Sequence, residues 1–448
     1  MNGSSGVVVL AAGQGTRMKS ALPKPLHPVC GLPMARHVIN AARELSPSRL
    51  VVVVGHESAF VREALAAPDV GFVEQTELLG TGDAVRRCQE ALAGCETVVV
   101  LNGDEPLVTG DSLRRLVAAL DGRTMAFGTQ RVADAGALGR VLRDDAGEVR
   151  AIVQAADYDG PPGEAEINWG QYAFEAVWLW EMLTKIPVSP KGEYYLTKLA
   201  DFAYDAGTPA ATVPVPADEA LGVDDRVKLA EAERRMRRRV LERHMRAGVT
   251  IVDPETTYID ATVEIAQDVT VLPNCYLQGE TRVAANVTIG PGTTLRNSRV
   301  GEGCEVRQSV IEESELGRNV RVGPFAHVRA GAVIGDDCEL GNYSEVKNSN
   351  VGRGVKMHHF SYLGDADVGE GTNFAAGAIT CNWDGVNKNR TTIGRGVFIG
   401  CDTMLIAPVT IGDNAVTGAG SVVTKDIGDG VKVAGVPARP MGHATPAD

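Results

Sequence analysis

The stretch IDATVEIAQDVTVLPNCYLQGETRVAANVTIGPGTTL, residues 259–295, carries a large aliphatic residue at every sixth position. The series consists of Ile259, Ile265, Val271, Leu277, Val283, Ile289 and Leu295. A second series of small or aliphatic residues lies two positions earlier and consists of Val263, Val269, Cys275, Thr281, Val287 and Thr293. Neither an α-helix nor an ordinary strand has a period of six. This period is typical of a left-handed parallel β-helix, in which about three hexads form one triangular coil.

The six-residue period continues through most of the second half of the chain. It slips around Val300 and Val306, resumes over 316–346, and returns over 368–374 and 393–423. One coil cannot bury its own apolar face, so the coils must stack, with Gly and Asn supplying the tight corners. The sequence therefore predicts a β-helix of hexapeptide repeats.

A long polar stretch, TCNWDGVNKNR at 380–390, interrupts the repeats. Loops that project from a rigid scaffold often carry binding or catalytic residues. The alternative is a solvated insertion without a function. We favour the functional loop.

Composition sets broad limits on the partners of the chain. It has 448 residues and a formal net charge of −13. The length predicts two or three domains, and the charge disfavours nucleic acid or an anionic membrane as the main partner, although a local basic pocket can still hold an anionic substrate. The eight cysteines are scattered without a CxxC pair, which predicts reduced packing residues. The eight histidines show no metal-ligand spacing.

The first residues, MNGSSGVVVLAAG, lack the basic region and cleavage site of a secretory leader. No apolar run reaches the roughly 18 residues that span a bilayer. We therefore expect a cytoplasmic protein.

A glycine-rich turn follows the first apolar strand. The strand covers Val7–Leu10 and leads into AAGQGTRM at 11–18, and Lys24 follows in LPKPL at 22–26. Glycines after a strand let backbone N–H groups approach a phosphate, and Arg17 and Lys24 can neutralise the charge of a triphosphate. The spacing fits neither the GxGxxG fingerprint nor the P-loop, so those two nucleotide-binding motifs are excluded.

Apolar strands alternate with helical patterns in the first half of the chain. The expected strands lie at 50–54 and 97–101, and the expected helices at 57–65 and 111–120. This alternation predicts an α/β domain with a mostly parallel sheet, whose ligands lie beyond the carboxyl ends of the strands. Asp104 follows one such end and is a candidate ligand for a divalent cation on a nucleotide phosphate. A helix N-cap or turn is its alternative role.

The segment 225–247 is dense in charge and predicts one long helix that joins the two halves. Its RRMRRR run at 234–239 could suggest nucleic acid. Because a charge run on a helix is usually a solvated face, and the whole chain is acidic, we expect no nucleic-acid partner.

Several motifs carry a resemblance to a known enzyme family. LAAGQGTRM, PKPL, LGTGDA (79–84), NGDEPL (102–107) and GEYYLT (192–197) resemble sugar-1-phosphate nucleotidyltransferases. With HHFSYLGDA (358–366) and ITCNWDG (379–385), the chain resembles the bifunctional N-acetylglucosamine-1-phosphate uridyltransferase and glucosamine-1-phosphate N-acetyltransferase family over nearly its whole length. The resemblance implies a Rossmann-like uridyltransferase domain at 1–224, a linker helix at 225–248, and a left-handed β-helix acetyltransferase domain with a C-terminal tail at 249–448.

For the first domain, the resemblance implies catalytic, binding and metal residues. Arg17 and Lys24 would stabilise the phosphates while a sugar-phosphate oxygen attacks the α-phosphate of UTP, and Asp104 with Asp224 would hold Mg²⁺. The nucleotide would contact Leu10, Ala11, Gly13, Gly15, Gln75, Gly80 and Thr81, and the sugar phosphate would contact Gly139, Gln154 and Asn168.

Four positions of this domain depart from the family pattern. Gln154 replaces a Glu, Trp169 replaces a Thr, Asn102 replaces an aromatic residue, and Asp224 stands where the second metal ligand is usually Asn. A carboxylate ligates Mg²⁺ at least as well as an amide does. An amide cannot accept hydrogen bonds as a carboxylate does, so Gln154 bears directly on which sugar the site prefers.

The repeat domain is expected to carry a second catalytic set. His359 lies in a turn beside Tyr362, and Glu345 lies one coil earlier. Since stacked coils place residues about 18 apart side by side, we expect Glu345 and His359 to meet. A histidine oriented by a carboxylate is suited to take a proton from an amine that attacks a thioester.

The resemblance adds binding residues to this second set. Arg329, Lys347 and Lys388 would hold the sugar phosphate, and Tyr362, Asn373 and Asn382 would position the amino sugar and the acetyl group. Acetyl-CoA would contact Asn382, Trp383, Cys401, Ala419 and Arg439. Two positions depart from the pattern, because Trp383 replaces a Tyr and Gly435 replaces a common Arg. We expect Arg439 in GVPAR to take over that phosphate contact.

The leading hypothesis is a bifunctional enzyme of UDP-N-acetylglucosamine synthesis. It would acetylate glucosamine 1-phosphate with acetyl-CoA and then couple N-acetylglucosamine 1-phosphate to UTP, releasing pyrophosphate. The resemblance also implies Mg²⁺ and a homotrimer, with small-molecule substrates and no membrane partner. The alternatives are a single-activity sugar-1-phosphate nucleotidyltransferase whose β-helix is structural or regulatory, and a non-catalytic assembly subunit. Glu345, His359 and Lys388 argue against the former, and Arg17 and Asp104 against the latter.

Overall fold

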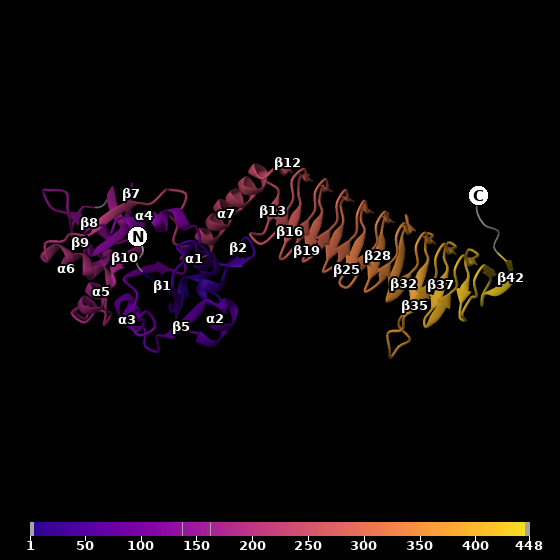
Figure 1. Cartoon of the computed structure of the whole chain (residues 1–448), viewed down its shortest axis with the longest axis horizontal. Helices are drawn as coiled ribbons and strands as arrows, with labels where there is room; N and C mark the ends of the chain where they lie inside the picture. Colours follow the sequence, from indigo (N-terminus) through magenta and orange to yellow (C-terminus); the bar gives the residue numbers. More distant parts are fainter. Residues whose placement is uncertain (1–3, 137, 162, 444–448) are drawn as a thin grey trace. The chain divides into compact units, whose positions relative to one another are not determined.

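The computed structural model describes residues 4–136, 138–161 and 163–443. The chain forms two compact units, Met1–Met236 and Arg237–Asp448, here called unit 1 and unit 2 (Figure 1). The first three residues of the stretch used to exclude a leader, and the last five of the predicted tail, lie outside the described residues.

Unit 1 is built around one mixed sheet. Its order is β11 (Ala211–Pro214), β7 (Met125–Val132), β10 (Ala165–Glu175), β6 (Thr97–Asn102), β1 (Ser5–Leu10), β4 (Arg49–Val54) and β5 (Val70–Glu74), with β8 (Arg140–Arg143) and β9 (Val149–Val153) attached beside β10. β10 runs antiparallel to β6 and β7, whereas β6, β1, β4 and β5 are parallel neighbours. The mostly parallel α/β fold predicted from the alternation is confirmed.

The helices of unit 1 follow the strands closely. They are α1 (Met34–Arg43), α2 (Ser58–Leu65), α3 (Thr81–Arg86), α4 (Gly110–Ala118), α5 (Ala176–Leu183) and α6 (Leu199–Asp205), and the 3₁₀ turns are η1 (Thr16–Met18), η2 (Lys24–Leu26), η3 (Ala155–Asp157) and η4 (Leu196–Lys198). A short hairpin joins β2 (Pro28–Val29) to β3 (Leu32–Pro33). A longer helix, α7 (Arg226–Arg246), contains the division between the two units.

The central strands of unit 1 are covered on both faces. Val7, Val8 and Val9 of β1 are all fully buried. Val8 packs into the core that holds Phe127 and Phe174, and its two neighbours pack into the core on the other side. Because successive strand residues point to opposite faces, the continuous VVV run is what a strand buried on both faces requires.

Unit 2 is a parallel β-helix with three sheets, one for each side of the coil. The first sheet contains β12 (Thr250–Ile251), β15 (Thr270–Val271), β18 (Thr288–Ile289), β21 (Glu305–Val306), β24 (Arg321–Val322), β27 (Glu339–Leu340), β30 (Lys356–Met357), β33 (Asn373–Phe374), β36 (Phe398–Ile399), β39 (Val416–Thr417), β41 (Val431–Ala434) and β42 (Arg439–His443). The second contains β13 (Tyr258–Ile259), β16 (Tyr276–Gln278), β19 (Thr294–Arg296), β22 (Val310–Glu312), β25 (His327–Arg329), β28 (Ser344–Lys347), β31 (Ser361–Gly364), β34 (Ile379–Cys381), β37 (Met404–Ile406) and β40 (Val422–Val423). The third contains β14 (Glu264–Ile265), β17 (Arg282–Val283), β20 (Arg299–Val300), β23 (Glu315–Leu316), β26 (Val333–Ile334), β29 (Asn350–Val351), β32 (Ala366–Val368), β35 (Thr391–Ile393) and β38 (Val409–Ile411).

The slip in the six-residue period is a shortened corner and not a break in the helix. Leu295 pairs with Leu277 on one side and with Ile311 on the other, so this coil has lost two residues while its strands stay in register. Leu277, Leu295 and Ile311 are all fully buried. Each coil therefore keeps an inward-facing apolar residue at this position, even where the spacing is shorter. The predicted left-handed hexapeptide-repeat fold is confirmed.

Small residues of the second series fill the corners of the coil. Cys275, Thr281 and Thr293 are fully buried, and the Thr281 hydroxyl donates to the backbone carbonyl of Gln278 at 2.7 Å. A buried hydroxyl needs such a partner, because an unpaired one costs free energy. No helix among the described residues is long and apolar enough to cross a bilayer.

Candidate active sites

The first candidate site lies at the carboxyl ends of β1 and β6. These parallel neighbours end together, with Leu10 opposite Asn102, and Gly103 donates its N–H to the Leu10 carbonyl at 2.9 Å. A Cβ at position 103 would stand 2.8 Å from that carbonyl oxygen, which explains the glycine. A cavity of about 840 Å³ opens here, large enough for a nucleotide and a sugar.

The structure brings most of the predicted residues of this domain to the cavity wall. The lining includes Leu10, Ala11, Gly13, Arg17, Lys24, Gln75, Gly80, Thr81, Asp104, Gln154, Asn168 and Asp224. Gly15 and Gly139 are not part of the lining. Gly139 accepts a hydrogen bond from the backbone N–H of Asn168 at 2.9 Å, so it supports a lining residue.

Gly15 affects the cavity through Lys24, whose side chain packs against it. It has φ +65, and a Cβ at this position would overlap the side chain of Lys24. A left-handed backbone favours glycine. The glycine therefore serves to bring Lys24 close to the turn.

Two carboxylates converge on the ammonium of Lys24. Lys24 Nζ contacts Asp104 Oδ2 and lies 3.2 Å from Asp224 Oδ1, while Arg17 Nη2 is 2.9 Å from the same Asp224 oxygen. Burial opposes the charge of Lys24, but the Coulombic attraction of Asp104 and Asp224 outweighs it, and the pKa of Lys24 is raised. Lys228 donates to the other Asp224 oxygen at 2.8 Å. Burial disfavours ionised Asp224, yet the hydrogen bond from Lys228 and the charge of Lys24 keep its pKa low.

This pair of carboxylates fits the way proteins hold Mg²⁺. Magnesium is usually bound through one or two carboxylates, with phosphate oxygens and waters completing the shell. Asp104 and Asp224 both contact the same cation, the Lys24 ammonium. Among the described residues, no group of three or more His, Cys, Asp or Glu side chains could hold a metal. The two aspartates would therefore depend on the substrate phosphates for the remaining ligands.

Gln75 is fixed by its amide nitrogen. Nε2 donates to the Gly80 carbonyl and to Asp83 Oδ2, both at 3.0 Å. Asp83 is fully buried and also accepts from Arg86 and Arg87 at 2.9 and 2.8 Å. Since the nitrogen is committed, the carbonyl oxygen of Gln75 is left as an acceptor for a base N–H.

Another part of the cavity lining is amide-rich and has one apolar wall. Gln154 Nε2 donates to Thr197 Oγ1 at 3.1 Å, and Asn168 Nδ2 donates to the Tyr172 hydroxyl at 2.6 Å. Trp169 is 8% exposed, and its Nε1 has no hydrogen-bond partner among the described residues. The apolar wall, which we call the Trp169 wall, consists of Val132, Ile167, Trp169 and Ala220, which line the cavity and pack in one cluster.

Sequence reasoning missed a buried carboxyl group beside Asp104. Glu105 is 5% exposed and accepts from Asn102 Nδ2 at 2.8 Å and from Gln171 Nε2 at 3.2 Å. Burial and the charge of Asp104 raise the pKa of Glu105 to about 8, while the two amide donors favour its ionised form. The signal was present, because Glu105 sits in the quoted NGDEPL motif next to the departure at Asn102.

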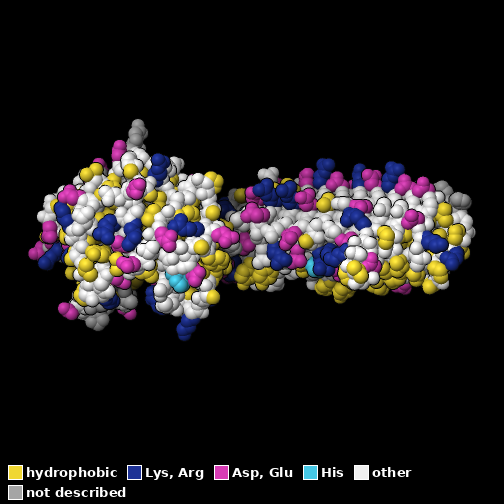
Figure 2. Space-filling view, turned by 90° about the horizontal axis from the view of Figure 1, so that it is seen from below, with side chains coloured by type: hydrophobic (Ala, Val, Ile, Leu, Met, Phe, Trp, Pro, Cys, Tyr) yellow, Lys and Arg dark blue, Asp and Glu magenta, His cyan; other side chains and the backbone are white. Residues whose placement is uncertain are grey.

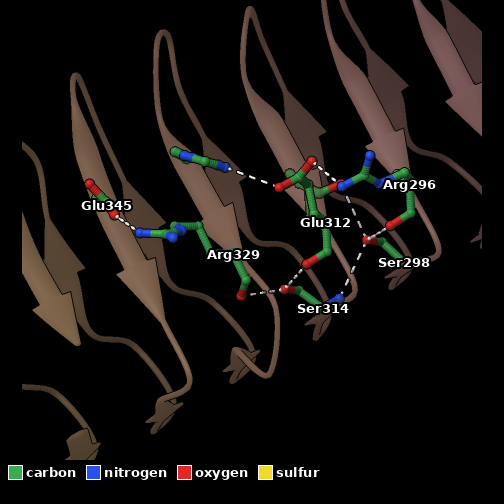
Figure 3. Close-up of polar contacts among 8 residues, drawn as sticks. Arg296, Ser298, Glu312, Ser314, Arg329 and Glu345 are labelled. Carbon is green, nitrogen blue, oxygen red and sulfur yellow. Dashed lines mark hydrogen bonds and ion pairs between the residues drawn. The ribbon is translucent and has the colours of Figure 1, made fainter. Parts of the chain in front are cut away.

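The second candidate site lies on the second sheet of unit 2, where outward side chains stack from coil to coil. Figure 3 shows a ladder of ion pairs in which Arg296 donates to Glu312 and Arg329 donates to Glu345, each at 2.7 Å. Beneath it, the Ser314 hydroxyl donates to the carbonyls of Glu312 and Arg329 at 2.6 and 2.9 Å. Arg296 and Glu312 are paired in register, whereas Glu345 lies opposite His327 and contacts Arg329 diagonally.

The predicted contact between Glu345 and His359 is wrong. Glu345 pairs in register with Tyr362 and binds Arg329, and no hydrogen bond joins it to His359 among the described residues. The reason is spacing, because neighbours in adjacent coils are 16 to 18 residues apart here, whereas Glu345 and His359 are separated by only 14. His359 lies instead at the preceding corner and is exposed.

Two lysines and two amides cluster beside Tyr362. Lys347 lies close enough to Lys388 to lower the pKa of Lys388, first through a hydrogen bond and then through charge repulsion. Asn382 Nδ2 donates to buried Asp365 at 2.5 Å and lies 3.3 Å from the Tyr362 hydroxyl. Asp365 also accepts from Asn348 at 2.5 Å. The polar loop at 380–390 thus supplies Asn382 and Lys388 to this cluster.

The remaining predicted residues lie at several places in unit 2. Backbone N–H groups of Gly377, Asp402 and Gly420 each bond one coil back, to the carbonyls of Phe360, Ala376 and Cys401. This stacking places His359, Ala376, Cys401 and Ala419 at the same corner position of successive coils. Trp383 is 57% exposed on the loop. Arg439 is exposed on β42, and Asn373 is exposed on the first sheet, not beside Tyr362 on the second.

Comparison with known proteins covers both units. Residues 7–157 match the MobA-like NTP transferase domain, 255–357 the GMPPB C-terminal domain, and 390–425 the bacterial transferase hexapeptide family of six repeats. The bifunctional protein GlmU of Streptomyces avermitilis is 45% identical, covering 95% of this chain and 90% of that protein. The chain belongs to the GlmU family. GlmU of Burkholderia multivorans is 44% identical over 95% of both chains, and GlmU of Brevibacillus brevis is 42% identical over 94% of this chain and 93% of its own.

Membership of the GlmU family confirms the predicted function. The chain is a bifunctional enzyme of UDP-N-acetylglucosamine synthesis, with a nucleotidyltransferase in unit 1 and a hexapeptide-repeat acetyltransferase that uses acetyl-CoA in unit 2. The alternatives of a single-activity enzyme and of a non-catalytic subunit are set aside by matches that extend over both units.

Proposed function

We propose that the cavity of unit 1 transfers the uridylyl group of UTP to N-acetylglucosamine 1-phosphate through Arg17, Lys24, Asp104 and Asp224. The observation that carries this assignment is the convergence of all four side chains at one end of the cavity. A sugar-phosphate oxygen attacks the α-phosphorus, and the bond to the β-phosphate oxygen breaks to release pyrophosphate. Because the nucleophile is already anionic, positioning and charge neutralisation carry the catalysis.

Asp104 and Asp224 would hold the Mg²⁺ of this reaction. When bound, the ion neutralises charge on the phosphates. The Lys24 ammonium would then exchange the two carboxylates for the substrate phosphates as its partners. The lysine backbone would stay where it is. Elsewhere in the cavity, Gln75 would accept from the uracil, while Gln154 and Asn168 would contact the sugar.

In unit 2, His359 would act as the general base for acetyl transfer. It removes a proton from the amine of glucosamine 1-phosphate as the nitrogen attacks the thioester carbonyl, and the C–S bond breaks to release coenzyme A as a thiol. Arg329, Lys347 and Lys388 would hold the sugar phosphate. The mutual repulsion of Lys347 and Lys388 supports this role, since a bound dianion would relieve it.

Three copies of the chain would complete the acetyltransferase sites. Asn373 is on a different sheet from Tyr362, so the predicted sugar-binding set is not gathered within one chain. Exposed apolar residues support association: Phe325, Tyr343 and Phe360 are 48%, 63% and 58% exposed. Figure 2 shows apolar side chains gathered along one edge of the repeat unit. Light scattering should give three times the chain mass, and a monomer at assay concentration would contradict this assembly.

The cytoplasm is the proposed location, because the two substrates that drive the reactions, UTP and acetyl-CoA, are intracellular metabolites. Small molecules would be the only substrates. The overall acidity of the chain, with a net charge of −13, agrees with the absence of a nucleic-acid partner.

Two substitutions test which unit carries out which reaction. Asp104→Ala should lower pyrophosphate release at least 100-fold, on the order expected for a group that stabilises transition-state charge, and leave acetyl transfer unchanged. His359→Ala should do the reverse. Asp111→Ala is a matched control, because Asp111 is an exposed aspartate on α4 that pairs with Arg114. Either variant keeping the activity assigned to its residue would refute that assignment.

A further inference from the structure

The amide of Asn102 lines the unit 1 cavity, close to Asp104 in sequence and to β10 in space. It is the last residue of β6, two positions before Asp104. Its carboxamide also packs against Gly170, where a Cβ would overlap Asn102 Nδ2. Gly170 follows Asn168 and Trp169 on β10, so Asn102 lies against the strand that carries the sugar contacts.

The orientation of this amide is set by Glu105. Glu105 Oε1 accepts from Asn102 Nδ2 at 2.8 Å, and its other oxygen accepts from Gln171 Nε2 at 3.2 Å. Both Glu105 and Gln171 are buried, at 5% and 2% exposure. Both oxygens of Glu105 accept hydrogen bonds in this arrangement, so the nitrogen of Asn102 faces Glu105 and the carbonyl oxygen does not.

The carbonyl oxygen of Asn102 is therefore available to a ligand. Asn102 lines the cavity, and its Oδ1 receives no hydrogen bond from the described residues. Trp169 precedes Gly170 on β10, and the Trp169 wall lines the same cavity as Asn102. An acceptor and an apolar wall in one cavity match an acylated amine, whose N–H donates while its methyl group needs apolar contact.

We propose that Asn102 is the specificity-determining acceptor for the acetamido N–H of the sugar 1-phosphate, and that Glu105 is a positioning residue that fixes its amide. The inference rests on the proposed uridylyl transfer and adds the group that distinguishes the acetylated sugar. It assigns a function to the departure from the family pattern at position 102.

The test compares two sugar phosphates in the full-length protein with UTP and Mg²⁺, by pyrophosphate release. N-acetylglucosamine 1-phosphate carries the N–H donor, whereas 2-deoxyglucose 1-phosphate has no donor at that carbon. Asn102→Ala should lower kcat/KM for the first sugar about tenfold, the value of one hydrogen bond with a buried partner, and change that for the second less than about twofold. The ratio between the two sugars should therefore fall.

A second variant tests the positioning role. Glu105→Gln keeps the shape but can offer either a donor or an acceptor to Asn102. We expect KM for N-acetylglucosamine 1-phosphate to rise severalfold, with KM for UTP and the melting temperature unchanged. Glu181→Gln, on the exposed face of α5, is the matched control.

The outcomes separate the inference from the proposed function. An unchanged sugar ratio in Asn102→Ala, or an equal loss with both sugars, would overturn the role of Asn102. Unchanged KM in Glu105→Gln would overturn the role of Glu105. If the unsubstituted protein released no pyrophosphate from N-acetylglucosamine 1-phosphate and UTP, the proposed function itself would fail, and this inference with it.

Discussion

Lys24 shows how much a single side chain depends on the backbone beside it. Its ammonium lies between Asp104 and Asp224, and its stem packs against Gly15. The lysine is thus held where a triphosphate would replace the carboxylates as its partner. At the residue scale, the proposed uridyltransferase site is a set of charges whose positions depend on the turns that carry them.

Gly15→Ala should damage uridylyl transfer through Lys24. The new Cβ would overlap the lysine side chain, so we expect kcat/KM for UTP to fall at least tenfold, about 1.4 kcal/mol, while acetyl transfer is unchanged. Gly94→Ala is the matched control, because Gly94 also has a left-handed φ, +84, but open space around its Cβ. Equal effects of the two substitutions would mean that backbone strain, and not the displacement of Lys24, is responsible.

The loop between β34 and β35 is the element that would supply acetyltransferase residues to the repeat scaffold. Ile393 follows Thr380 by 13 positions, where the repeat needs only five or six. The loop contributes Asn382 and Lys388 to the cluster around Tyr362. The coils on either side remain paired, since β32 meets β35 and β34 meets β37.

Deleting residues 383–389 should separate fold from function in unit 2. The deletion returns Ile393 to the sixth position after Thr380, so we expect the β-helix to form with an unchanged circular dichroism spectrum. Acetyl transfer should fall at least 100-fold, because Lys388 is lost and Asn382 is displaced. Uridylyl transfer is the internal control. Retained acetyl transfer would show that the loop is a solvated insertion.

Helix α7 carries a histidine that should make stability depend on pH. His244 is 6% exposed, its Nε2 has no partner among the described residues, and burial together with the nearby Arg243 lowers its pKa from 6.5 to about 4. The unfolded chain binds the proton more tightly, so the free energy of unfolding falls as the pH drops from 6.5 toward 4.

His244→Leu should remove this part of the pH dependence. Between pH 7.5 and 4.5, we expect the free energy of unfolding to fall by about 2 to 3 kcal/mol less in the variant than in the unsubstituted protein. Urea unfolding at the two pH values measures the difference. If both proteins lost the same stability, His244 would not be buried as a neutral group.

Local periodicity was enough to predict both folds, but not the contacts between coils. The apolar series from Ile259 to Leu295 identified the β-helix, and alternation identified the α/β unit. The pairing of Glu345 with His359 failed because the two residues are 14 positions apart, whereas coils without an inserted loop span 16 to 18 residues and the coil with the loop spans 25. Glu105 was missed because its role depends on Gln171, which is distant in sequence and adjacent only across the paired strands β6 and β10.

At the scale of the whole molecule, one chain joins two reactions in which the product of the first is the substrate of the second. Unit 2 would make N-acetylglucosamine 1-phosphate, and unit 1 would consume it. Each unit has its own core and its own predicted site residues. The central claim is therefore that both half-reactions occur on this chain, with all departures from the family pattern in place.

The most direct measurement is mass spectrometry of the products formed from glucosamine 1-phosphate, acetyl-CoA, UTP and Mg²⁺, with each component omitted in turn. We predict UDP-N-acetylglucosamine in the complete mixture alone, and N-acetylglucosamine 1-phosphate when UTP is omitted. Accumulation of N-acetylglucosamine 1-phosphate in the complete mixture, with UTP untouched, would contradict the account of unit 1. An absence of acetylated sugar in every mixture would contradict the account of unit 2.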